Sequence, residues 1–334
     1  MIRALYDGPF WSKSLNAMAK RAIKSGRGQP HSKTIRNFLG LKFSRSVLEC
    51  GCPLPLSTHR SLPSPRVWMQ MLAASLTLSC CFGAEPTPLI HTHAHNDYEH
   101  KRPLFDALDH GFCSVEADIY IVDGQLLVAH NRSQVKPERT LQSLYLDPLR
   151  ERVKKNGGRV YADGPEVTLL IDIKPDWRTI YPTLREVLKQ YADILSTFEG
   201  DQKKTNAITA ILSGSRSLDM FKGETVRYAA YDGTLANLDS DASANLIPWV
   251  SENWGAGFKW PGHGEMSAAD KLKLKEIVGK AHQKGRQVRF WGAPDNPTFW
   301  REMLANGVDL INTDDLDGVQ KFFESRSSTT DGHR

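Results

Sequence analysis

The sequence predicts an α/β protein folded as a single (β/α)8 barrel of the TIM type. From residue 89 onward, short β-branched or aliphatic runs alternate with segments of helical period. Alternating strands and helices imply a parallel sheet, and eight strands over about 250 residues match a closed barrel better than an open sheet. No GxGxxG motif follows the first run, which argues against a dinucleotide-binding fold.

The expected elements follow in chain order. Strands are expected at 89–95, 114–120, 167–174, 207–214, 226–233, 246–253, 287–293 and 308–315. Helical period predicts helices at 103–110, 140–155, 178–190, 266–284 and 297–306. Gly111, Gly285 and Gly307 each precede a strand, where a glycine that ends a helix is expected.

The net charge of +5 is divided unevenly along the chain. Residues 1–84 hold 12 Lys and Arg residues against Asp7 and Glu49, whereas the remainder holds 31 basic and 36 acidic residues. The basic excess therefore belongs to the N-terminal part and not to the barrel, so we expect no nucleic-acid partner.

The segment 67–83, VWMQMLAASLTLSCCFG, is the longest apolar stretch. Preceding arginines, a short apolar core and small residues at its end are typical of a secretory signal peptide, and the core is short for a transmembrane helix. We expect a basic extension at 1–66, disordered or the result of a start placed too early, a signal peptide at 67–84, the barrel at 85–325 and a disordered tail at 326–334. The protein would then be exported, to the periplasm or the outside of the cell. A basic tail followed by a membrane anchor is the alternative.

Polar residues gather at the C-terminal ends of the expected strands, the rim where active sites of such barrels lie. Residues two apart on a strand face the same side, so Glu116 and Asp118 both point inward, and Asp172 and Lys174 repeat the arrangement. Three inward carboxylates would repel one another unless a cation lies between them. Oxygen ligands favour a hard ion, so we expect Glu116, Asp118 and Asp172 to hold one divalent cation, Mg²⁺ first and Ca²⁺ as the alternative.

Two histidines flank this acidic group. His95 ends the first expected strand, and His130 ends a hairpin arm that turns at Asp123-Gly124 and returns toward the strand with Glu116 and Asp118. Two histidines beside a metal fit a pair of acid–base or nucleophilic groups that act on a phosphodiester.

The motif series His95-Asn96, Glu116-Ala-Asp118, His130 and Asp172-Ile-Lys174 resembles that of the PLC-like phosphodiesterase superfamily. This superfamily includes glycerophosphodiester phosphodiesterases, sphingomyelinase D and phosphatidylinositol-specific phospholipase C. The resemblance covers residues 89–320 and implies a TIM-like barrel with one divalent metal. It also implies catalysis by His95 and His130, metal ligation by the three acids and contact of Lys174 with the substrate phosphate.

One departure concerns the substrate. Glycerophosphodiesterases usually carry His-Arg-Gly at the end of the first strand, whereas this chain reads His95-Asn96-Asp97-Tyr98. That stretch and the closing segments RFWGAPDNPTFW and VDLINTDDLDG are more similar to a less-characterised bacterial and fungal branch, whose substrate the motifs do not specify.

These observations predict a monomeric metal-dependent phosphodiesterase that acts on a glycerophosphodiester, a lysophospholipid or a similar phosphodiester, with peripheral membrane contact. Asn96 and Trp254 join Lys174 as expected substrate contacts, and Trp291 is a further aromatic residue that follows a strand end.

Two other functions stay open. The His-x-His spacing of His91, His93 and His95 also resembles the entry motif of amidohydrolase-type zinc enzymes, with Asp314 as the acid, although the runs at 207–214 and 226–233 contain no histidine. The other is a catalytically inactive barrel that only binds a phosphate ligand.

Overall fold

The computed structural model describes residues 85–330. The predicted extension at 1–66 and signal peptide at 67–84 lie outside the described residues. Within the described part, no helix is both long and apolar enough to cross a membrane.

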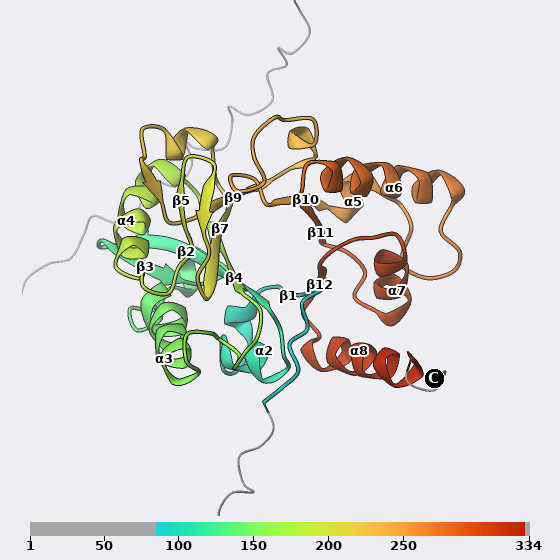
Figure 1. Ribbon diagram of the computed structural model, residues 1–334, viewed down its shortest axis with the longest axis horizontal. Coiled ribbons are helices and arrows are strands. Elements are labelled where there is room, and N and C mark those ends of the chain that lie inside the picture. The colour runs from blue at the N-terminus through green and yellow to red at the C-terminus, as the bar shows by residue number, and fades with distance from the viewer. Residues whose placement is uncertain (1–84, 331–334) are drawn as a thin grey trace, which may run out of the picture. The chain divides into compact units, whose positions relative to one another are not determined.

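Eight parallel strands form a ring (Figure 1). In order around the ring they are β1 (Thr92–Ala94), β2 (Ser114–Val122), β4 (Val167–Ile173), β7 (Ile208–Gly214), β9 (Ala230–Gly233), β10 (Trp249–Asn253), β11 (Gln287–Trp291) and β12 (Ile311–Thr313). β12 pairs with β1, and a parallel bridge between Arg289 and Leu310 joins β11 to the segment that enters β12. The predicted TIM-like α/β barrel is therefore confirmed, and each predicted run overlaps one of its strands.

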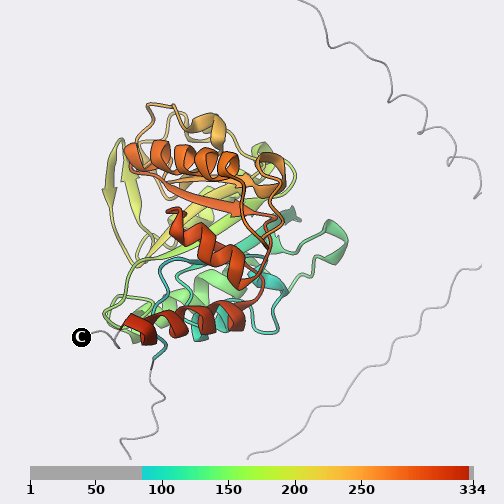
Figure 2. The same ribbon diagram turned by 90° about the vertical axis from the view of Figure 1, so that its right-hand side faces the viewer.

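Helices cover the outside of the ring. They are α2 (Phe105–Asp109), α3 (Asp147–Lys155), α4 (Trp177–Lys189), α5 (Trp254–Gly257), α6 (Ala268–Gln283), α7 (Pro297–Ala305) and α8 (Leu316–Thr330), with shorter helical turns η1 (Asp97–Glu99), η2 (Arg132–Gln134), η3 (Gln142–Leu146), η4 (Leu218–Phe221) and η5 (Leu235–Asn237). The side chains of Asp176, Ser267 and Asn296 accept backbone N–H groups at the starts of α4, α6 and α7. Figure 2 shows α6, α7 and α8 together on one side of the barrel.

The C-terminal boundary differs from the prediction. A disordered tail was expected from residue 326, but α8 continues to Thr330. No Gly or Pro lies between Val319 and Thr330, so nothing in the sequence ends the helix there.

Two additions complete the sheet structure. β3 (Gln125–Val128) pairs antiparallel with β2, which confirms the predicted hairpin. A small antiparallel sheet consists of β5 (Thr197–Glu199), β6 (Gln202–Lys204) and β8 (Val226–Arg227).

The inside of the barrel is apolar at one end and polar at the other. Phe198 of β5 packs in an inner cluster with Leu170, Ile211, Ala230, Trp249 and Leu310. Two positions further along four of these strands, the inward residues are Asp172, Ser213, Asp232 and Ser251, which line a pocket. The alternation that fills the N-terminal end of the barrel thus places polar groups at its C-terminal mouth.

Candidate active site

The pocket at the barrel mouth has a volume of about 790 Å³. Seven of the predicted site residues line it: His95, Asn96, Glu116, Asp118, His130, Asp172 and Lys174. They come from β2 and β4 and from the segments that follow β1, β3 and β4, so strand pairing brings together groups that are far apart in the sequence. We call this side of the pocket the metal half.

The three acids of the metal half lie close enough to share one cation. Asp118 and Asp172 are opposite one another on β2 and β4, and ligand oxygens from Glu116, Asp118 and Asp172 lie within 4.8 Å of one another. Oδ2 of Asp118 lies 2.7 Å from the hydroxyl of Tyr98 and 3.1 Å from Nζ of Lys174. Oδ1 of Asp118 is buried and has no hydrogen-bond partner among the described residues. This donor set fits a hard divalent cation, because the cation would satisfy that oxygen.

The backbone at Gly214 makes room for this group. Gly214 has a φ of 71°, and a Cβ there would collide with the carboxylate of Asp172. A glycine at the end of β7 therefore lets Asp172 lie against the neighbouring strand.

In the metal half, the pKa of each aspartate depends on its burial and on the charges of its neighbours. Burial, with Glu116 and Asp172 nearby, raises the pKa of Asp118 to about 7, and burial also raises the pKa of Asp172. Burial opposes the charge of Lys174, but the two aspartates outweigh it and raise the pKa of this amine, whose Nζ lies 2.8 Å from Asp172 Oδ1. A bound cation would favour the ionised carboxylates.

The two predicted catalytic histidines lie on either side of the acids. Nδ1 of His95 is 2.9 Å from Oδ1 of Asp314 and 3.0 Å from Nδ2 of Asn96. Burial opposes protonation of His95, but the bond to Asp314 prevails and raises the pKa. Nδ1 of His130 is 3.1 Å from the hydroxyl of Tyr98. Among the described residues, Nε2 of neither histidine has a hydrogen-bond partner.

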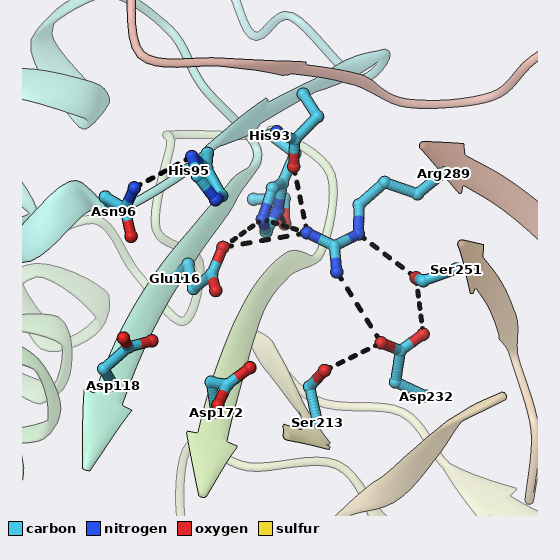
Figure 3. A network of polar contacts seen from close by, with 12 residues as sticks. His93, His95, Asn96, Glu116, Asp118, Asp172, Ser213, Asp232, Ser251 and Arg289 are labelled. Carbon is cyan, nitrogen blue, oxygen red and sulfur yellow. Dashed lines mark hydrogen bonds and ion pairs between the residues drawn. The ribbon is translucent and has the colours of Figure 1, made fainter. Parts of the chain in front are cut away.

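The opposite side of the pocket contains a buried arginine that sequence reasoning missed. We call Ser213, Asp232, Ser251 and Arg289 the arginine half; Figure 3 shows it beside the acids. Both oxygens of Asp232 accept hydroxyl groups, from Ser213 at 2.9 Å and from Ser251 at 2.6 Å. Nε of Arg289 donates to Ser251 at 3.1 Å, and its NH2 group lies 3.6 Å from Asp232. The signal was present, because Arg289 is the inward residue between Val288 and Phe290.

Glu116 connects the two halves. Its Oε2 lies 3.2 Å from Nε2 of His93 and 3.7 Å from NH1 of Arg289. Burial alone would raise the pKa of Glu116, but the bond to His93 and the charge of Arg289 lower it to about 2. Burial and Arg289 lower the pKa of His93 to about 4, so this histidine is neutral at pH 7. Glu116 is therefore an anion whether or not a metal is bound.

A zinc site of the amidohydrolase type is not assembled. His91 is exposed, and its Nδ1 contacts the carbonyl of Asp309 at 2.9 Å. His93 is fully buried between Ser114, Glu116 and Arg289. Within residues 85–330, the only group of side chains spaced to hold a metal is the set of three carboxylates.

The predicted contact of Trp254 with the substrate is wrong. Trp254 is 3% exposed, stacks on Phe258 with ring centroids 4.1 Å apart, and donates its indole N–H to the carbonyl of Trp260. Trp254 begins α5, directly after β10, and packs against Phe290 and Phe299 and not into the pocket. Trp291 instead lines the pocket and is 42% exposed.

Comparisons with known proteins agree with this geometry. The family model described as an AIM6-like phosphodiesterase domain matches residues 84–232, and that of the glycerophosphoryl diester phosphodiesterase family matches residues 287–317. Altered inheritance of mitochondria protein 6 of Eremothecium gossypii is 33% identical over 271 residues, which span 70% of this chain and 69% of the relative. A homolog of that protein in Arthroderma benhamiae is 27% identical over 275 residues, 72% of this chain and 85% of the relative.

Solved structures are more distant. A crystal structure of a glycerophosphodiester phosphodiesterase from Parabacteroides distasonis matches 73% of this chain and 100% of its own, with 15% sequence identity and a TM-score of 0.43.

Proposed function

The chain belongs to the AIM6-like phosphodiesterase family and is a phosphoric diester hydrolase, and from this premise we propose a metal-dependent reaction on a small phosphodiester. The observation that carries the proposal is the buried, unpartnered Oδ1 of Asp118 within a group of three carboxylates, between two histidines that keep a ring nitrogen free. The cation that we propose is Mg²⁺, with Ca²⁺ as the alternative, because the three candidate ligands are all carboxylate oxygens. When bound, it would neutralise negative charge on the phosphate.

The chain's own residues supply the rest of the chemistry. Lys174, held by Asp118 and Asp172, presents an ammonium group to the nonbridging oxygens of the phosphate. His95, whose pKa is raised by Asp314, is suited to give a proton to the leaving oxygen. His130 lies across the acidic group and is suited to activate the attacking nucleophile.

The lining of the pocket supports a small polar substrate group. Opposite the metal half, Ser215, Arg216, Thr234 and Glu252 join the arginine half. Exposed Trp291 at the same mouth could accommodate an apolar chain. We therefore propose a glycerophosphodiester, a lysophospholipid or a similar phosphodiester as the substrate.

Location and assembly form a separate part of the proposal. The apolar segment 67–83 supports export to the periplasm or the outside of the cell, and we propose a monomer that contacts membranes at its surface. Fractionation of the native cell, followed by intact-mass analysis and light scattering, tests these points. Full-length protein recovered from the cytoplasm as a stable dimer would contradict them.

The function is tested by turnover of the full chain. The enzyme is stripped with EDTA and assayed with Mg²⁺, Ca²⁺, Mn²⁺ or Zn²⁺ on bis-p-nitrophenyl phosphate, glycerophosphocholine and lysophosphatidylcholine. Phosphorus NMR separates a monoester product from a cyclic phosphate. Glu116→Gln and His95→Ala should abolish turnover, whereas Asp241→Asn, at an exposed acid outside the pocket, should not.

Two results would redirect the proposal. Amide hydrolysis with Zn²⁺ and no phosphodiesterase activity would favour the amidohydrolase alternative. Binding of these phosphodiesters without turnover under any of the four metals would favour a barrel that only binds its ligand.

A further inference from the structure

The hydroxyl of Tyr98 lies at the centre of the metal half. Tyr98 belongs to η1, directly after β1, and is 3% exposed. Its oxygen lies 2.7 Å from Oδ2 of Asp118, 2.7 Å from Oδ1 of Asn96 and 3.1 Å from Nδ1 of His130. One buried hydroxyl therefore contacts a proposed metal ligand, a proposed catalytic histidine and the residue beside the other histidine.

The single hydrogen of the Tyr98 hydroxyl determines which of its partners must donate a hydrogen bond and which must accept one. A tyrosine hydroxyl has one hydrogen to donate and can accept two hydrogen bonds. As a metal ligand, Asp118 is an ionised carboxylate that can only accept, so the hydrogen of Tyr98 must go to Asp118. His130 must then donate its Nδ1 hydrogen to the tyrosine oxygen.

Asn96 supplies the remaining hydrogen bond to the Tyr98 oxygen in one of the two orientations of its side-chain amide. In the structure Oδ1 of Asn96 faces Tyr98 and Nδ2 faces His95. Turning the amide over exchanges these two atoms, and its NH₂ group then donates the second hydrogen bond that the tyrosine oxygen can accept. Its carbonyl then faces Nδ1 of His95, whose hydrogen it shares with Asp314. Asn96 has a φ of 49°, in the left-handed region, which asparagine tolerates better than most residues.

We propose that Tyr98 is a positioning residue that connects Asp118 to His130 and keeps the Nδ1 of His130 protonated. The Nε2 of His130 is then the nitrogen without a hydrogen, free to accept a proton in the pocket. The same hydroxyl holds Oδ2 of Asp118 and leaves Oδ1 for the cation. The catalytic part of this inference rests on the proposed phosphodiesterase function.

The connection gives the two histidines different roles. Nδ1 of His95 faces the carboxylate of Asp314, which stabilises the charged ring, while Nδ1 of His130 faces a neutral hydroxyl and lies 3.7 Å from Asp118. The two rings therefore differ in the partner that orients them at Nδ1, a carboxylate for His95 and a hydroxyl for His130.

Tyr98→Phe in the full chain tests the proposal, because it deletes the hydroxyl and keeps the ring. The matched control is Tyr161→Phe, which deletes an equally buried hydroxyl that donates to the carbonyl of Phe112 outside the pocket. We expect Tyr98→Phe to lower kcat about 10- to 100-fold at saturating Mg²⁺, with KM within about twofold of wild type. Tyr161→Phe should retain wild-type kcat.

Nitrogen NMR of histidine-labelled protein gives a readout that needs no substrate. The His130 resonance, assigned by its absence in His130→Ala, should show a protonated Nδ1 in the wild type and a shift toward the Nε2-protonated tautomer in Tyr98→Phe. An Nδ1 that carries no hydrogen in the wild type, or a kcat of Tyr98→Phe equal to that of Tyr161→Phe, would overturn the proposal. If no phosphodiester is turned over, the NMR result still decides the role of Tyr98, and only the proposed function fails.

Discussion

In the metal half of the pocket, Oδ1 of Asp118 is buried and has no hydrogen-bond partner among the described residues, whereas in the arginine half both oxygens of Asp232 accept serine hydroxyls. Both acids are nearly fully buried at the mouth of the same barrel. The difference is that Arg289 lies beside Asp232, while the cationic side chain beside Asp118, Lys174, is shared with Asp172. A buried acid with all its partners can stay charged inside the fold without a ligand, and a buried acid that lacks one is suited to bind a ligand.

The largest expected effect comes from breaking the metal half at Asp118. Asp118→Asn should lower kcat/KM about 10³-fold, because the loss of a metal ligand removes several kcal/mol of charge stabilisation. Calorimetric titration should show that Mg²⁺ binding is lost. Asp232→Asn is the same change in the arginine half and should keep Mg²⁺ binding. Equal Mg²⁺ affinity in Asp118→Asn and the wild type would disprove the distinction between the halves.

The next effect comes from breaking the arginine half. Arg289→Met should lower the free energy of unfolding by about 3–5 kcal/mol, because Asp232 and Glu116 would both lose this buried guanidinium, and only Asp232 has a second arginine nearby, Arg216 at 3.7 Å. Urea unfolding measures this loss. The double variant with Asp232→Asn should be less destabilised than the sum of the two single variants, because Asp232 then carries no charge that has lost Arg289, while the loss at Glu116 is the same in both backgrounds. Strict additivity would show that the two side chains do not interact.

Trp254 in the core and Trp291 at the pocket mouth allow a direct comparison of these two regions. Trp254→Ala should lower the free energy of unfolding by about 3–5 kcal/mol, because it opens a cavity among Phe258, Phe290 and Phe299. Trp291→Ala removes an exposed ring and should change that free energy by less than about 0.5 kcal/mol. Similar losses in chemical denaturation would contradict the placement of the two rings.

The last prediction concerns Asp97, a third buried acid, which adjoins the metal half. Burial raises its pKa to about 7, although bonds from Tyr145 and Leu104 lower it. The folded protein thus holds this proton more tightly than the unfolded chain. The resulting stabilisation is present below the ordinary aspartate pKa of about 3.9 and is lost as the pH rises to about 7.

Asp97→Asn should remove this pH dependence. Between pH 4 and 7 the wild type should lose up to about 1.4 kcal/mol per pH unit relative to the variant. Unfolding in urea at a series of pH values gives both slopes, and parallel slopes would show that Asp97 titrates alike in the folded and unfolded states.

Much of the fold and part of the site could be predicted because strand alternation is a local property. The acids at 116 and 118 are two apart in an apolar run, and Asp172 and Lys174 repeat that spacing, so both pairs face the barrel mouth. The same parity could have identified Arg289, which lies within β11. It could not have excluded Trp254, because that residue begins α5 and its position depends on the packing of this helix.

Tyr98 could not have been predicted in the same way. It lies in η1, outside any strand, and its partners come from β2 and from the residues after β3. No spacing in the sequence relates residue 98 to residues 118 and 130.

The sequence by itself determined the order of strands and helices and which residues of each strand face inward, because both follow from periodicities of two and of 3.6 residues. Only the tertiary structure decided which inward groups meet. The register of β2 and β4 places Asp118 opposite Asp172. Closure of the barrel between β11 and β12 brings Arg289 into contact with His93 and Glu116. Such contacts depend on strand register and ring closure, which are properties of the assembled barrel and not of any segment.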